Sequence, residues 1–182
     1  MAIALPSQDM ARAIMRISHE ILEKNSGSEN LTLLGIPTGG AHLARRIAAN
    51  INSIESTDVP CGTLDITLHR DDLRLRPPRA LMSTVIPSVG IEGRTVVLID
   101  DVLFSGRTIR AALDALGDIG RPDSVQLAVL VDRGHRQLPI RADYVGKNLP
   151  TSSSQSISVH FAEVDGLDQV LLEEATSAGG AL

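Results

Sequence analysis

The stretch from residue 96 to residue 108 constrains the fold of this chain more than any other. Residues 96–99 are four consecutive aliphatic residues, which is typical of a strand buried on both faces of a sheet. Asp100 and Asp101 follow at once, and a short Ser/Gly/Thr loop leads to residues 109–116, which have helical periodicity. A buried strand, a polar loop and a helix in succession predict an α/β protein.

The same stretch predicts an anion site. The first N–H groups of a helix lack backbone partners and lie at the positive end of its dipole, so they favour a phosphate. Ser105 and Thr108 add hydroxyl donors, and Gly106 lets the backbone approach closely. Asp100 and Asp101 would repel a phosphate, but they can accept hydrogen bonds from vicinal hydroxyls or help to hold a hydrated Mg²⁺. A phosphate beside a diol describes ribose 5-phosphate.

Two common phosphate motifs are absent from the sequence. It contains neither G-x-x-x-x-G-K-[ST], which binds nucleoside triphosphates, nor G-x-G-x-x-G, which binds dinucleotides. A plainer interpretation stays open, in which the two acids only start a turn after a buried strand.

A second strand–loop–helix unit precedes the first along the chain. Residues 31–36 predict a strand, 37–40 a Gly-rich turn and 41–51 a helix with one apolar face. In a parallel sheet both loops emerge at the carboxyl edge, where open α/β sheets bind ligands. Two anion loops there would hold the two phosphate ends of one substrate; alternatively, the earlier loop is only a tight connection.

Composition restricts the class of protein. The 182 residues suit one domain, and because 43% are apolar but only 2% aromatic, the core must be aliphatic, as in α/β proteins. A net charge of -5 excludes a general polycation made for nucleic acid, so any RNA-binding face must be local. The single Cys61 excludes an internal disulfide framework and a Cys-based zinc site. With no signal peptide or transmembrane run, we expect a cytoplasmic protein.

The segment before the central motif predicts a first helix and a lid. We expect the helix over 8–24, capped by Ser7, and a strand over 62–68. The charged, Pro-broken residues 69–79 would form a lid, with Arg70 closing over a leaving pyrophosphate. A solvated hairpin tip is the alternative for this segment.

The segment after the motif predicts a base site. A buried strand over 125–131 ends in Asp132 and Arg133, at a strand edge that favours a ligand. Beyond it we expect a last strand over 157–161 and a short helix or edge strand over 164–172. The whole would be a single domain over 1–173, followed by a disordered tail over 174–182.

Residues 96–108 closely resemble the ribose-phosphate-diphosphate (PRPP) binding motif of type I phosphoribosyltransferases. The resemblance implies their fold, a central, mainly parallel sheet flanked by helices, with a flexible lid and a hood. Purine-salvage relatives carry an acid four residues after the first carboxylate, beside the purine N7. This chain has Phe104 there, which cannot exchange a proton, so a pyrimidine fits better.

Two further runs, 65–73 and 131–152, look like those of the pyrimidine operon attenuator family. That bacterial family binds pyr messenger RNA and also has uracil phosphoribosyltransferase activity. The resemblance implies that uracil and PRPP give UMP and pyrophosphate with Mg²⁺. It also implies that UMP or UTP in the same pocket favours binding of the pyr operon leader.

The resemblance assigns roles to individual residues. Asp100, Asp101 and Arg70 would take part in catalysis, mainly by positioning and charge stabilisation. PRPP or nucleotide would contact Thr38, Gly39, Gly40, Asp100, Asp101, Val102, Leu103, Phe104, Ser105, Gly106, Arg107 and Thr108. Asp132 and Arg133 would serve the base, and Mg²⁺ would arrive with PRPP near the aspartates, without a dedicated protein site. RNA would contact Arg16, His19, Lys24, Arg141 and Lys147, on a homodimer or a higher homo-oligomer.

Two departures from the family keep three hypotheses open. Relatives carry a basic side chain at the position of Gly39 and a hydroxyl residue at that of Met15. The favoured hypothesis is an RNA-binding regulator that is also a uracil phosphoribosyltransferase. Gly39 motivates a nucleotide-sensing RNA binder with negligible catalysis. Met15 and the net charge motivate a salvage enzyme without RNA binding.

Overall fold

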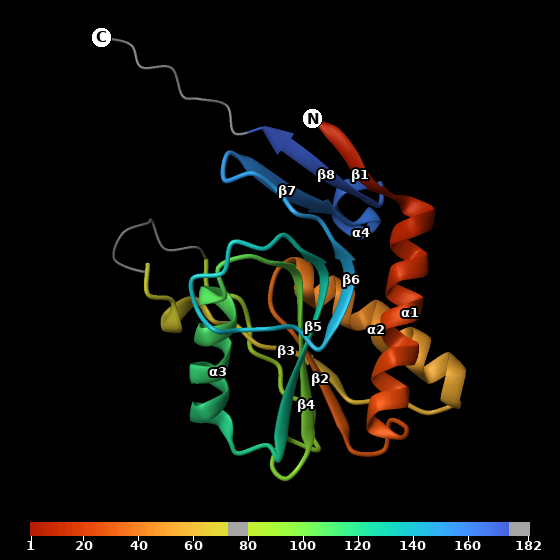
Figure 1. Cartoon of the computed structure of the whole chain (residues 1–182). Coiled ribbons are helices and arrows are strands. Elements are labelled where there is room, and N and C mark those ends of the chain that lie inside the picture. Colours follow the sequence, from red (N-terminus) through yellow and green to blue (C-terminus); the bar gives the residue numbers. More distant parts are fainter. Residues whose placement is uncertain (73–79, 175–182) are drawn as a thin grey trace.

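The computed structural model describes residues 1–72 and 80–174 (Figure 1). Strands and helices alternate through the first two thirds of the chain, as the predicted succession requires. In chain order the elements are β1 (Ala2–Pro6), α1 (Ser7–Asn25), β2 (Leu31–Gly35), α2 (Gly39–Glu55), β3 (Cys61–Thr63), the 3₁₀ turn η1 (Thr67–His69), β4 (Thr95–Leu103), α3 (Arg107–Ile119), β5 (Ser124–Asp132), β6 (Tyr144–Asn148), β7 (Gln155–His160), α4 (Ala162–Asp165) and β8 (Gln169–Glu174).

The central sheet has five strands in the order β3-β2-β4-β5-β6, and every neighbouring pair is parallel. α1 and α2 cover one face of this sheet, and α3 covers the other (Figure 1). Because β2 and β4 are neighbours and parallel, the loops that follow them lie side by side at the carboxyl edge. The predicted α/β class is confirmed.

A second sheet of three strands lies over this edge, and we call β1, β7, α4 and β8 together the hood. Its order is β1-β8-β7, and both pairs are antiparallel. Ala2 faces Leu172, so the hood depends on pairing the two ends of the chain. Arg46 of α2 anchors it, because its guanidinium donates hydrogen bonds of 2.5 to 2.9 Å to the carboxylates of Glu163 and Asp168.

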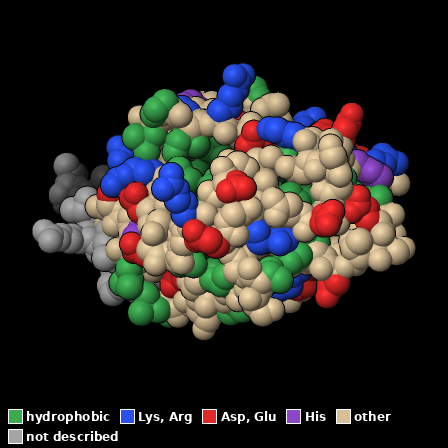
Figure 2. Space-filling model, turned by 90° about the horizontal axis from the view of Figure 1, so that it is seen from below, with side chains coloured by type: hydrophobic (Ala, Val, Ile, Leu, Met, Phe, Trp, Pro, Cys, Tyr) green, Lys and Arg blue, Asp and Glu red, His purple; other side chains and the backbone are tan. Residues whose placement is uncertain are grey.

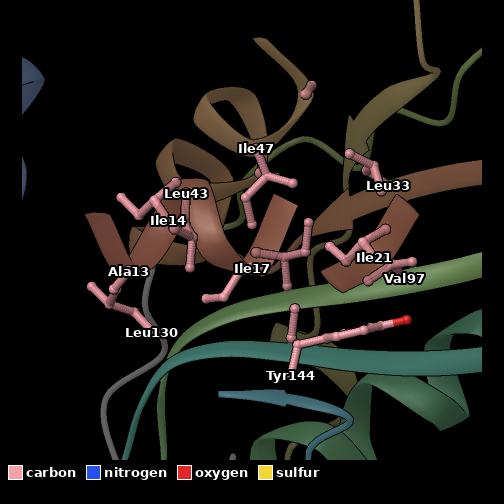
Figure 3. Packing of buried hydrophobic residues seen from close by; sticks show 14 of the residues in the cluster. Ala13, Ile14, Ile17, Ile21, Leu33, Leu43, Ile47, Val97, Leu130 and Tyr144 are labelled. Atoms are coloured by element: carbon pink, nitrogen blue, oxygen red, sulfur yellow. The ribbon is translucent and has the colours of Figure 1, made fainter. Parts of the chain in front are cut away.

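The core consists of two aliphatic layers, one on each face of the central sheet. On the α1 side, Ile14, Ile17 and Ile21 recur at helical spacing and pack against α2 and the strands (Figure 3). Tyr144 of β6 closes this layer and donates a hydrogen bond of 2.7 Å to Oε1 of Gln126. Close packing gives the loops at the carboxyl edge fixed starting points.

Two strands differ from their predictions. The strand predicted over 62–68 is wrong, since β3 ends at Thr63 and η1 follows. Asp65 explains the early end, because its carboxylate accepts hydrogen bonds from the N–H (3.0 Å) and hydroxyl (2.6 Å) of Thr67 and so turns the chain. β4 is longer than predicted and continues to Leu103, so both aspartates belong to the strand.

The first helices and the C-terminal segment also differ from expectation. The predicted cap is wrong, because α1 begins at Ser7 itself and has no side-chain cap. α2 begins at Gly39, so part of the Gly-rich turn already belongs to the helix. The segment 164–172 contains the end of α4 and the start of β8, which includes Glu174, a residue predicted to lie in the tail. Residues 175–182 lie outside the described residues.

The end of the molecule away from the hood carries mixed charge. In Figure 2, which views the described residues from below, Lys and Arg side chains lie interspersed with Asp and Glu side chains. This arrangement agrees with the modest net charge of -5. Within residues 1–72 and 80–174, no helix is long and apolar enough to cross a membrane.

Candidate active site

A cleft lies at the carboxyl edge of the central sheet. It consists of two adjoining cavities of about 500 and 680 Å³, both lined by Arg70, Asp100 and Thr108. The first cavity reaches the loop after β2, and the second reaches the loop after β4. Every residue predicted to contact PRPP lines one of the two cavities, except Gly40, which is buried. The structure therefore brings these residues together.

The two aspartates at the end of β4 differ in environment. Asp100 is only 7% exposed, and its carboxylate accepts a hydrogen bond of 3.0 Å from the N–H of Asp101. Asp101 is partly exposed and accepts a bond of 2.8 Å from the N–H of Val102. Burial, together with the charge on Asp101, raises the pKa of Asp100 well above its usual range. Such a pair favours hydroxyl groups or a cation and disfavours an anion.

The loop after β4 forms a cradle at the start of α3. Gly106 has a φ of 94°, in the left-handed region that favours glycine, and α3 begins at the next residue, Arg107. The carbonyl oxygen of Ser105 accepts hydrogen bonds from the N–H groups of Gln137 (2.9 Å) and Leu138 (3.1 Å). These bonds tie the loop to the segment after β5. The start of α3 lines the second cavity, and the first N–H groups of a helix favour an anion.

The loop after β2 packs against the aspartates. Its Pro37–Thr38 peptide bond is cis. A Cβ atom at Gly39 would overlap the carboxylate of Asp101, and one at Gly40 would overlap the carbonyl oxygen of Ile99. Glycine at both positions lets α2 begin this close to β4. Any side chain at position 39 would meet the carboxylate of Asp101 at its Cβ atom.

Arg70 lies between the two halves of the cleft. Its guanidinium donates two hydrogen bonds of 2.8 Å to the carboxylate of Asp72, and these raise the pKa of Arg70 above its ordinary value. The adjacent Asp71 accepts a bond of 2.5 Å from Arg107 of the phosphate cradle. The start of the predicted lid is thereby docked on α3. Residues 73–79, which make up the rest of that lid, lie outside the described residues.

The predicted base-binding residues lie at the end of β5, and their polar atoms are engaged within the protein. Asp132 accepts hydrogen bonds from Arg136 (2.5 Å) and from the N–H of Gly134 (2.9 Å). Burial alone would raise the pKa of Asp132, but these bonds lower it. Arg133 is 8% exposed, and its guanidinium lies 4.1 Å from the centre of the Phe104 ring. Neither Asp132 nor Arg133 is among the described residues that line the two cavities, but Phe104, which Arg133 covers, lines the second.

Several residues that line the cleft were not predicted as site residues, and three of them are instructive. Asp65 and Ile157 line the first cavity, and Gln137 lines the second. Gln137 falls inside the run 131–152, so the resemblance there was the available signal. Ile157 belongs to β7, and no local pattern indicates that the hood reaches the cleft. Asp65 falls within the predicted strand over 62–68, but β3 ends before it, at Thr63.

The predicted RNA-binding residues gather on a different surface, formed by α1 and β6. Arg16 donates a hydrogen bond of 2.5 Å to the carbonyl oxygen of Gly146, and Lys24 donates one of 2.6 Å to Asp143. The other three side chains are exposed: His19, Arg141 and Lys147. Met15, on the same helix, is 41% exposed. None of these residues is among the described residues that line the cleft, so the two surfaces are separate.

The chain is similar to known proteins over nearly its whole length. A family model described as "Phosphoribosyl transferase domain" matches residues 4–166. A protein of Streptomyces coelicolor, named "Bifunctional protein PyrR", is 63% identical over 97% of this chain and 92% of its own length. A protein of the same name from Leifsonia xyli is 60% identical over 98% of both chains. These relatives confirm the resemblance to the pyrimidine operon attenuator family.

Solved structures agree in fold. A hypoxanthine phosphoribosyltransferase of Staphylococcus aureus has a TM-score of 0.69 at 19% identity, covering 93% of this chain and 90% of its own. The hypoxanthine phosphoribosyltransferase of Trypanosoma cruzi has a TM-score of 0.71 at 16% identity, covering 96% of this chain and 97% of its own. The predicted type I phosphoribosyltransferase fold is confirmed. The chain therefore belongs to the phosphoribosyltransferase family and, within it, to the group of proteins named bifunctional protein PyrR.

Proposed function

We propose that the protein transfers ribose 5-phosphate from PRPP to uracil, and that it binds pyr messenger RNA when a uridine nucleotide occupies the cleft. One observation carries the catalytic half. Two aspartates and a phosphate cradle follow one another on β4 and α3, opposite a second glycine loop. This order supports a ligand with a diol between two phosphate groups, which PRPP has.

Three contacts would hold PRPP. The N–H groups at the start of α3, with the hydroxyls of Ser105 and Thr108, bind the 5-phosphate. Asp100 and Asp101 accept hydrogen bonds from the ribose hydroxyls. The loop from Thr38 to Gly40 binds the pyrophosphate. Together they fix the ribose C1 against the base, and such fixing supplies a large part of the rate enhancement.

The reaction replaces one bond at C1 by another. The bond from C1 to the pyrophosphate oxygen breaks, a bond to N1 of uracil forms, and the N1 proton passes to the leaving pyrophosphate or to solvent. The aspartates stabilise the positive charge that develops on the ribose. Arg70 exchanges its partner Asp72 for the leaving pyrophosphate. No residue of the protein forms a covalent intermediate.

Mg²⁺ would enter the site together with PRPP. The carboxylate oxygens of Asp100 and Asp101 are the ligands that this ion prefers. Within the described part of the chain, no cluster of three or more His, Cys, Asp or Glu side chains would hold a metal ion alone. Oxygen atoms of PRPP and water would therefore complete the shell. When bound, the ion neutralises charge on the pyrophosphate.

The base would lie at the end of β5, beside Asp132 and Arg133. Phe104 lines the cleft and offers a ring, but it has no group that exchanges a proton with a purine N7. A pyrimidine needs only stacking and a few backbone hydrogen bonds there. Uracil is the pyrimidine that the relatives' family implies.

The regulatory half rests on the name of the relatives and on the surface formed by α1 and β6. Exposed basic side chains, among them Arg141 and Lys147, suit an unpaired RNA loop. A homodimer would bring two such surfaces together. With that role the protein would act in the cytoplasm, where pyr messenger RNA is made.

A product assay tests the catalytic half. We expect labelled uracil to become UMP only when PRPP and Mg²⁺ are both present, and hypoxanthine to give no IMP. A folded sample that makes no UMP would overturn this half. The nucleotide-sensing RNA binder, which Gly39 favours, would then be the better description.

A titration with labelled pyr leader RNA tests the regulatory half. We expect UMP to tighten binding, and added salt to weaken it, because contacts with phosphates release counterions. Lys147→Gln should weaken binding, whereas Arg121→Gln, which removes an exposed charge after α3, should not. A sample that makes UMP but binds no RNA would be a salvage enzyme.

A further inference from the structure

We infer that Arg133 is a positioning residue, which acts on the base by holding the ring of Phe104 rather than by contacting the base itself. The inference rests on the proposed function and concerns the base end of the same cleft. In this arrangement the ring of Phe104 faces the pyrimidine. The buried guanidinium of Arg133 lies on the other side of the ring and fixes its orientation.

The guanidinium of Arg133 is held in place by the hood. Its Nε donates a hydrogen bond of 3.2 Å to Oγ1 of Thr151, and its Nη2 donates one of 2.6 Å to the carbonyl oxygen of Gln155. Gln155 is the first residue of β7. The side chain is 8% exposed, and burial lowers the pKa of Arg133 from its ordinary value. These contacts direct its donors towards the hood.

The same guanidinium lies over the ring of Phe104. Its central carbon lies 4.1 Å from the ring centre, well inside the 6 Å within which a cation attracts an aromatic face. Arg and an aromatic ring also stack face to face, because the guanidinium is planar. One side of the ring is therefore fixed by a buried partner.

Two other neighbours restrict Phe104. The ring of His135 lies 6.1 Å away at an interplanar angle of 65°, an edge contact, and this histidine bonds to the carbonyl oxygen of Thr151 at 2.6 Å. Arg136 donates a hydrogen bond of 2.8 Å to the carbonyl oxygen of Phe104. Ring and backbone are thus both held, yet the residue stays 42% exposed and lines the cleft.

This arrangement connects the hood with the base. Since Thr151 and Gln155 belong to the loop before β7 and to β7, the ring of Phe104 keeps its orientation only while the hood is in place. A fixed ring stacks on a base without losing side-chain freedom at binding, which is why pre-organised sites bind more tightly. Arg133 therefore sets the affinity for uracil without touching it.

A double-mutant cycle tests the inference. Steady-state kinetics of UMP formation would compare the wild type with Arg133→Gln, Phe104→Ala and the double variant. We expect each single change to raise KM for uracil about tenfold, with KM for PRPP within about twofold. Because Arg133 acts through Phe104, the double variant should be no worse than Phe104→Ala alone.

Controls separate this role from a merely structural one. Arg94→Gln removes another arginine, which is partly buried and directly precedes β4. Its guanidinium donates hydrogen bonds to the hydroxyl of Thr32 and the carbonyl oxygen of Leu31, both in β2. It should lower thermal stability and leave KM for uracil unchanged. Arg133→Lys, which keeps the charge, should recover part of the affinity and serves if Arg133→Gln does not fold.

Two results would overturn the inference. If the two tenfold effects multiplied, KM for uracil would rise about a hundredfold in the double variant. Arg133 would then contact the base independently of Phe104. Unchanged KM in Arg133→Gln would remove its role altogether. A wild type that makes no UMP would instead refute the proposed function, and the inference with it.

Discussion

The two loops of the cleft look alike in sequence but use their space differently. The loop after β4 carries side chains outward: Arg107 donates to Gln137 at 2.9 Å and to Asp71 at 2.5 Å. The loop after β2 carries glycines, and the space that their side chains would fill is taken by Asp101 and by the β4 backbone. One loop meets a ligand with side chains and backbone, and the other mainly with backbone.

The difference indicates where the charge for pyrophosphate must come from. Position 39 cannot hold a basic side chain while Asp101 keeps its place. Among the described residues that line the cavity on that side, Arg70 is the only Lys or Arg. Binding of the 5-phosphate should therefore depend on the loop after β4, whereas binding of the pyrophosphate should depend on Arg70 and on Mg²⁺.

The largest effect should come from the aspartates between the loops. The double change of Asp100 and Asp101 to Asn removes the acceptors for the ribose hydroxyls, so we expect kcat/KM for PRPP to fall at least about 100-fold. Steady-state kinetics would measure this, with thermal unfolding as a check that the variant folds. Full activity would refute the assignment of the diol to this pair.

Gly40→Ala should damage the fold itself. Its Cβ would overlap the carbonyl oxygen of Ile99 and lie 3.0 Å from Cα of Asp100, and neither backbone atom can rotate away. We expect the free energy of unfolding to fall by about 2 to 3 kcal/mol in denaturant titrations. Gly117→Ala in α3 is the matched control, because nothing lies within 4 Å of its Cβ, and it should stabilise by up to about 1 kcal/mol. Equal stabilities of the two variants would contradict this packing.

Gly39→Ala should change activity more than stability. The new Cβ meets the side chain of Asp101, which can rotate, so the loop survives but the carboxylate leaves its place. We expect kcat/KM for PRPP to fall about tenfold, with a smaller loss of stability than in Gly40→Ala. An unchanged kcat/KM would show that the position of Asp101 does not matter.

The smallest effect concerns Asp71. Its carboxylate accepts a hydrogen bond from Arg107 and lies 3.6 Å from the guanidinium of Arg110. A carboxylate beside the cradle repels a phosphate, so we expect Asp71→Asn to tighten binding of ribose 5-phosphate about threefold in calorimetry. Asp114→Asn, which removes the other carboxylate near Arg110, should have no effect. If Asp71→Asn instead weakened the binding of ribose 5-phosphate, the ion pair of Asp71 with Arg107 would be needed to hold the loop after β4 in its conformation.

The two strand–loop–helix units were predictable because their signals are local. Four aliphatic residues before Asp100, and glycines before an apolar helix face, specify a buried strand and a tight turn from neighbouring residues alone. α3 ends at Ile119, directly before Gly120. The parallel order of the sheet then brings the loops together without further information.

The hood and its contacts were not predictable in the same way. β1 and β8 pair across the whole chain, with Ala2 facing Leu172, and short strands at the two ends carry no mutual signal. The early end of β3 depends on a side chain, since Asp65 bonds to Thr67 where alternation predicts a strand. Burial of Arg133 depends on β7, so its place behind Phe104 follows from tertiary structure only.

The measurement that tests the central claim most directly is a calorimetric titration of the two halves of PRPP. If the loops form two separate anion sites, the protein should bind ribose 5-phosphate and Mg²⁺-pyrophosphate at the same time. Saturation with one should change the Kd of the other by less than about fivefold. Mutually exclusive binding would show that the cleft has one anion site, and would contradict the assignment of one phosphate end to each loop.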